Sequence, residues 1–134
     1  MLNAYPHRAT HPEVQEHLIR IEGAGTSAPV KSPEKLGAGV TVTRTSEGVI
    51  KFAWDDNPGV FLGATATLQA KTPADVANHT VVFDEYDGDD LELELRLYEL
   101  TESTGDVVGA LEDLAADEFI TVRVLFSTSA VGGA

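Results

Sequence analysis

The sequence predicts an all-β domain, either a β-sandwich or a jelly-roll-like barrel of seven or eight mostly antiparallel strands. The clearest observation is the segment Leu91–Tyr98, in which leucines alternate with glutamate, arginine and tyrosine. A period of two is typical of a strand with one face in a core, whereas a helix would spread these leucines around its axis. Other alternating segments follow at short intervals, separated by turns rich in glycine, proline and aspartate, as in sandwiches and barrels.

Size and composition limit the class of protein. With 134 residues the chain is long enough for one domain, and without cysteine it forms no disulfide and no thiolate metal site. It has no apolar run that resembles a signal peptide or a membrane span. A net charge of −13 makes nucleic acid an unfavourable partner.

The negative charge is concentrated in one part of the chain. Residues 84–118 hold fourteen acidic residues and one basic residue, a difference of thirteen, whereas residues 1–40 hold four of each. Such charge ordinarily keeps a protein in solution. The alternative is a molecule with two ends, a neutral end that docks on a partner and an acidic end that faces solvent.

Residues 1–13 are expected to form an extended arm, before a domain at 14–131 and a tail at 132–134. Pro6 and Pro12 disfavour helix at the residues before them, and apolar residues are few. Such an arm either lacks a fixed structure or lies on a partner. His7, His11 and His17 raise the possibility of zinc, but the first two lie on the arm and no thiolate assists them. We therefore expect solvent-exposed histidines and no metal.

The first half of the domain contains a predicted hairpin. Val14–Ile21 is expected to be a strand, with a short amphipathic helix as the alternative, because its apolar residues do not alternate cleanly. Gly23–Gly39 is a long connection rich in glycine, serine and proline. Val40–Thr45 and Val49–Trp54 then alternate on either side of a tight turn with a glycine, which predicts a hairpin.

The second half begins with a predicted strand at Val60–Ala70, with Val60, Leu62, Ala64, Ala66 and Leu68 on one face. Thr72 and Asp75 have the spacing of a capping box, so one helical turn is expected there. Three further segments are predicted strands: His79–Tyr86, Leu91–Tyr98 and Phe119–Phe126. The segment Val107–Ala116 is ambiguous.

Few residues offer catalytic chemistry, and we expect neither an enzyme nor a cofactor. No serine lies in a nucleophile-elbow motif, and no glycine-rich motif matches a phosphate-binding loop. The turn Asp84–Asp90 is a candidate for calcium, because it places acids around a glycine. Its spacing differs from that of the twelve-residue calcium loop, so an ordinary charged turn is the expected interpretation.

The order of these segments resembles the small virion structural proteins encoded near the capsid genes of tailed bacteriophages. The likeness extends over about residues 15–131 and is a pattern of strands and turns rather than a catalytic motif. The segments that carry it, after the glycine- and proline-rich connection, are Leu36–Arg44, the strand ending at Trp54, Asp55–Gly59, Thr72–Val82 and the strand ending Val124–Ser127.

The resemblance implies a non-enzymatic head decoration (cement) protein on the outer capsid surface of the virion. It would bind the major capsid protein as a homotrimer and stabilise contacts between capsid subunits, without contacting nucleic acid or a membrane directly. No site residues carry over from the family. The arm makes Tyr5, Pro6, His7, Arg8 and His11 the candidate capsid contacts.

Two alternatives belong to other classes of protein. One is a tail- or fibre-associated structural module, which is also rich in β-structure and non-enzymatic. The other is a carbohydrate-binding β-sandwich, and an exposed aromatic platform beside Asp84–Asp90 would favour it.

Overall fold

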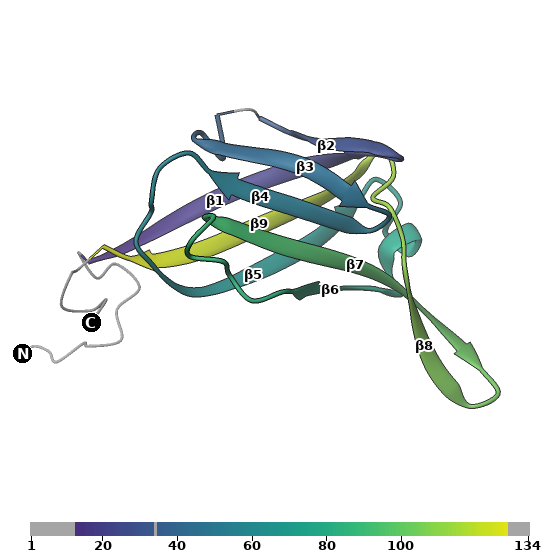
Figure 1. Cartoon of the computed structure of the whole chain (residues 1–134). Helices are drawn as coiled ribbons and strands as arrows, with labels where there is room; N and C mark the ends of the chain where they lie inside the picture. Colours follow the sequence, from purple (N-terminus) through teal and green to yellow (C-terminus); the bar gives the residue numbers. More distant parts are fainter. Residues whose placement is uncertain (1–12, 34, 129–134) are drawn as a thin grey trace, which may run out of the picture.

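A computed structural model describes residues 13–33 and 35–128, which fold into two antiparallel sheets packed face to face (Figure 1). Sheet A consists, in spatial order, of β2 (Ser27–Lys31), β1 (Val14–Ala24), β9 (Glu118–Ser127) and β5 (Val60–Ala70). Sheet B consists of β3 (Val40–Ser46), β4 (Val49–Trp54), β7 (Glu92–Ser103) and β6 (His79–Phe83), and β8 (Asp106–Leu111) pairs with the distal part of β7. The prediction of an all-β sandwich is confirmed, and the sheets do not close into a barrel.

The core lies between the two sheets and consists of the residues that the period of two places inward. Leu93, Leu95 and Leu97 are fully buried on β7, as predicted. They meet the inward residues of the other strands, among which the largest fully buried ones include Phe52, Phe126, Ile19, Ile21 and Ile120. Alternating strands therefore build a core of the kind that aligned sandwiches have.

The described residues form nine strands rather than seven or eight. The additional strand β2 lies inside the predicted connection Gly23–Gly39 and pairs only with β1. Because an edge strand of five residues buries little, its sequence carries no clear alternation. The ambiguous segment Val107–Ala116 contributes β8, and the segment from Val14 is a strand rather than a helix.

The predicted face of β5 is wrong over its first residues. Val60 and Leu62 are 42% and 52% exposed, whereas Phe61 points into the sandwich. A bulge between Phe61 and Gly63 shifts the pairing with β9, so that Ala64 and the inward residues after it keep the predicted face. An extra residue in one strand reverses the alternation locally, and the sequence pattern does not reveal it.

The expected helical turn is present as the 3-10 helix η1 (Pro73–Val76), but the expected capping box is absent. The Thr72 side chain makes no capping hydrogen bond, and the Thr72 carbonyl accepts a bond from the backbone N–H of Asp75 instead. The part of the chain described by the structure contains no helix of the length and apolar character needed to cross a membrane.

The acid-rich segment is divided between the two ends of the molecule (Figure 1). The connection Asp84–Asp90 lies at the end where β1 begins and β9 finishes, because Tyr86 packs on Phe126 there. The projecting β7–β8 hairpin and residues 112–118 lie at the opposite end. The hypothesis of one neutral end and one acidic end is therefore wrong, since the segment crosses the whole length of sheet B.

Candidate functional site

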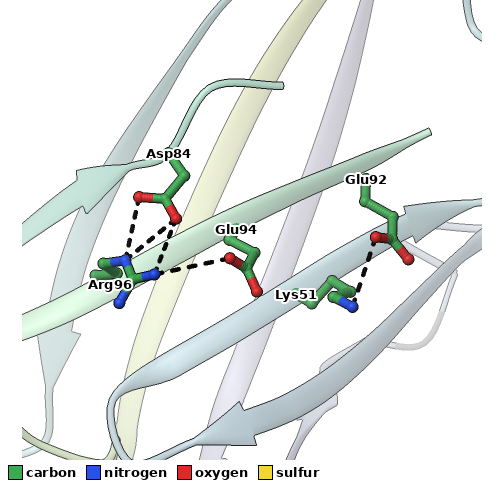
Figure 2. A network of polar contacts seen from close by, with 5 residues as sticks. All are labelled: Lys51, Asp84, Glu92, Glu94 and Arg96. Atoms are coloured by element: carbon green, nitrogen blue, oxygen red, sulfur yellow. Dashed lines mark hydrogen bonds and ion pairs between the residues drawn. The ribbon is translucent and has the colours of Figure 1, made fainter. Parts of the chain in front are cut away.

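Two of the five carboxylates in the Asp84–Asp90 turn are held by hydrogen bonds, and Figure 2 shows those of Asp84. The Arg96 guanidinium donates to both oxygens of Asp84 at 3.0–3.2 Å, and this lowers the pKa of the Asp84 carboxyl. Asp87 accepts the backbone N–H groups of Asp90 and Asp89 at 3.1 and 2.9 Å, which lowers the pKa of Asp87. These bonds are those of a charged turn.

Three carboxylates near this turn come close together. One oxygen from each of Asp87, Asp90 and Glu92 lies within 4.8 Å of the others. Asp87 and Asp90 are exposed, and Asp87 is already used by the turn. Exposed acidic clusters of this kind are common without a cation, so the cluster alone is not evidence of a calcium site.

The aromatic residues beside the turn face inward. The Tyr86 ring stacks on Phe61, with centroids 5.1 Å apart and planes 9° apart, and meets Phe126 and Trp54 edge-on. Burial raises the pKa of the Tyr86 hydroxyl. The described residues beside the turn thus present no exposed aromatic platform. This part of the structure therefore gives no support to the carbohydrate-binding alternative.

The outer face of sheet B carries paired charges (Figure 2). Lys51 lies 3.5 Å from Glu92, and Arg96 lies 3.8 Å from Glu94 in addition to its contact with Asp84. Glu92 and Glu94 lie on the outward face of β7, beside these cations, and their side chains are about one-third exposed. Such surface pairs contribute at most about 1 kcal/mol each.

Strand β5 presents an edge without charge. β9 pairs with one side of β5, and no described strand pairs with the other side. Residues 59–70 contain no charged residue and no proline. Edge strands are usually protected by lysine, proline, a bulge or a covering element. β5 has a bulge at Phe61–Gly63 and contacts η1, but it carries no charge and no proline, so the rest of its edge is suited to pairing with another chain.

An open groove runs between β5 and β6, the edge strands on this side of the two sheets. Its volume is about 430 Å³. On the other side of the sandwich β2 lies against β3. The groove offers small apolar and hydroxyl side chains beside unpaired backbone, a surface that fits an extended polypeptide. Its lining is Ala64, Thr65, Ala66 and Leu68 from β5 and His79, Thr80, Val81 and Phe83 from β6.

The five arm residues proposed from the sequence as capsid contacts lie outside the described residues: Tyr5, Pro6, His7, Arg8 and His11. The adjoining residue Glu13 was assigned to the arm, but its carbonyl accepts the backbone N–H of Thr128 at 2.7 Å. The next residue, Val14, pairs with Ser127, which also pairs with Val60 of β5. The arm therefore joins the domain at the end of sheet A where β5 begins, with β9 between the junction and β5.

His17 is a structural residue rather than a free surface histidine. Its Nδ1 accepts a hydrogen bond of 2.9 Å from Nε1 of Trp54, and its ring packs edge-on against Phe126. Partial burial lowers the pKa of His17, in agreement with an Nδ1 that accepts a proton rather than carrying one. The expectation of solvent exposure is wrong for this histidine.

The structure also assembles a cluster that sequence reasoning missed. His79 on β6 and Glu99 on β7 are cross-strand partners, and Glu112 follows β8, with its N–H bonded to the Leu97 carbonyl. The three residues are widely spaced in the chain, so no linear motif signals them.

Comparisons of this chain with protein-family models, with curated proteins and with solved structures find no match.

Proposed function

We propose that this chain is a non-enzymatic bacteriophage head decoration protein. In this proposal a homotrimer binds the outside of the capsid and stabilises contacts between major capsid protein subunits. The resemblance of its strands and turns to small phage virion proteins motivates the proposal. The structural observation that supports it is the uncharged, unpaired edge of β5 in a chain with a net charge of −13.

The edge provides a physical route to binding another protein. An extended capsid segment added beside β5 would pair its backbone groups with those of the strand, while the groove toward β6 would receive alternate side chains. At about 3.3 Å per residue, eleven residues give a line of contact of roughly 36 Å. A protein that binds the assembled shell and not free subunits stabilises the shell by linkage, and a three-fold lattice position favours a trimer.

The distribution of charge indicates which side would face the capsid. Because acidic residues occupy both ends of the sandwich, the uncharged side along β5 is better suited to docking than either end. The arm joins the domain at the end of sheet A where β5 begins, across β9 from Val60, so the candidate contacts Tyr5 to His11 can act together with this edge. In this orientation the β7–β8 hairpin lies beside the contact rather than inside it.

The test is to add purified chain to capsids that lack it and to count the bound copies per capsid subunit. Leu62→Lys places a charge at an exposed position of the β5 edge and should weaken addition at least tenfold. Val30→Lys is the matched control, because Val30 is 61% exposed on β2, the opposite edge strand of sheet A. Equal addition of both variants would contradict the assigned edge, and addition to tails instead of capsids would favour the tail-associated alternative.

The arm is tested separately by deleting residues 2–12, which keeps Glu13 and its bond to Thr128. We expect the truncated chain to remain folded but to add more weakly to capsids, because an arm becomes ordered only where a partner compensates its loss of entropy. Glu102→Lys with Asp106→Lys on the exposed hairpin is the charge-reversal control. If the truncated chain adds normally while the charge reversal abolishes addition, the hairpin end is the docking end.

A further inference from the structure

We propose that His79, Glu99 and Glu112 form a binding site for one Zn²⁺ ion at the base of the β7–β8 hairpin. One ligand atom of each residue lies within 4.8 Å of the other two. This inference goes beyond the capsid-binding proposal, although His79 also lines the groove that the proposal uses. It differs from the expectation drawn from the sequence, which considered only the amino-terminal histidines as zinc ligands.

The backbone holds the three residues on one side of sheet B. His79 and Glu99 are directly opposite each other across β6 and β7, on the face that carries Leu95 and Leu97. Glu112 follows β8, where its N–H donates to the Leu97 carbonyl at 3.1 Å, and its carboxylate lies 2.8 Å from Nε2 of His79. The three ligands therefore come from β6, from β7 and from the residue after β8.

The imidazole of His79 is buried and meets Glu112 through one of its two nitrogens. Its side chain is only 5% exposed, and Nε2 lies 2.8 Å from Oε2 of Glu112. Its Nδ1 is buried and has no hydrogen-bond partner among the described residues. Because Nε2 is the nitrogen that meets Glu112, it is the ligand atom of the proposed site, and Nδ1 takes no part in it.

Glu99 brings a second carboxylate to the same place without a cation of its own. Among the described residues its side chain forms no ion pair or hydrogen bond, although it lies near Glu112. Two carboxylates this close repel each other in a partly buried site, and a divalent cation between them would remove that repulsion. An acidic pair with a buried imidazole thus has the charge and the donors for a metal ion.

The donor set selects the class of metal. One imidazole nitrogen and two carboxylate oxygens, with solvent completing the shell, suit Zn²⁺, whereas Ca²⁺ and Mg²⁺ prefer sites made entirely of oxygen. Ligand atoms at about 2.0–2.1 Å from tetrahedral zinc are roughly 3.3 Å apart. The distance of 2.8 Å between His79 and Glu112 therefore needs only a small separation of the two side chains.

Zinc at this position would join β6, β7 and the end of β8. The hairpin beyond the site is exposed on both faces, with Val107 67% and Val108 52% exposed, and the core gives it little support. An ion that binds the folded chain and not the unfolded one raises the melting temperature with its concentration. We therefore assign the site a structural role at the base of the hairpin.

The test is calorimetric titration of the full chain with ZnCl₂. A chain carrying His7→Gln and His11→Gln serves as the background, so that the arm histidines do not contribute. We expect one ion per chain in this background, at least tenfold weaker binding after a further His79→Gln, and no change after Glu102→Gln, a matched hairpin control. Co²⁺ should give visible absorption bands that His79→Gln removes, and CaCl₂ should not compete.

Two results would overturn the proposal. One is the absence of zinc binding in the His7 and His11 background, and the other is binding that His79→Gln leaves unchanged. If His79→Gln does not fold by circular dichroism, Glu99→Gln and Glu112→Gln decide the question in the same way. Tenfold weaker binding in both supports the site, and unchanged binding in both rejects it.

Discussion

The core of β7 allows a quantitative test, because Leu95 and Glu94 are adjacent in the chain and face opposite sides of sheet B. Leu95 is fully buried and pairs with Ile50 and Phe83. Leu95→Ala removes roughly three buried carbons, which at about 0.8 kcal/mol each gives about 2.4 kcal/mol. The cavity left behind increases the loss of unfolding free energy to about 2.5–5 kcal/mol.

Glu94→Ala is the matched control in the same strand. The Glu94 side chain is 28% exposed and lies 3.8 Å from Arg96, which keeps its closer bonds to Asp84 when Glu94 is removed. The expected change in unfolding free energy is within about 0.5 kcal/mol. The two substitutions should therefore differ by at least about 2 kcal/mol.

Urea unfolding followed by Trp54 fluorescence measures both variants. Trp54 is the only tryptophan in the chain and is 6% exposed, so its emission reports the loss of the core. The midpoint should fall for Leu95→Ala at an unchanged slope, and its melting temperature should fall by about 10 °C. A loss under about 1 kcal/mol for Leu95→Ala, or equal losses for the two variants, would refute the assigned faces of β7.

Other predictions concern an ion pair and a close backbone contact. Arg44 donates two bonds to Asp113 at 2.8 and 2.9 Å, so Asp113→Asn should lower the unfolding free energy by about 1–3 kcal/mol in urea titrations. The hydrogen bonds from Arg44 are the main reason that the folded-state pKa of Asp113 lies below its ordinary value. The ionised carboxylate therefore contributes its full share of the unfolding free energy above about pH 4, and this share is lost as the pH falls through the folded-state pKa. Asp113→Asn should not show this loss in acid titrations. Gly23→Ala would place a Cβ 2.2 Å from the Ala115 carbonyl oxygen and should cost about 1–3 kcal/mol in thermal melts, whereas Gly63→Ala meets nothing within 4 Å and should cost less than about 1 kcal/mol.

Much of the fold could be predicted because alternation is a local property of a strand. Val49–Trp54 and Val60–Ala70 have the predicted bounds, and the inward leucines of β7 are buried as expected. The short strand β2 was missed because it pairs on one side only and buries too little to require a pattern. The bulge at Phe61 was missed because it depends on the pairing with β9 rather than on the residues of β5.

The candidate sites depend more strongly on pairings between distant segments. His79, Glu99 and Glu112 come together because β6 and β8 both pair with β7, and their sequence spacing contains no sign of this. The open groove exists because β5 and β6 end their respective sheets on the same side. The sequence of residues 59–70 contains no charged residue, but it does not reveal that these residues form a strand at the edge of a sheet.

The sequence by itself determined that this chain is an all-β domain with an acidic character, because a period of two and net charge are read along the chain. The tertiary structure decided where the charge lies, dividing the acid-rich segment between both ends of the molecule as it crosses sheet B. It also decided which strands lie at the edges of the two sheets and which side chains of the candidate zinc site come together. Strand order and register are set by contacts between residues far apart in sequence, and a local pattern does not encode them.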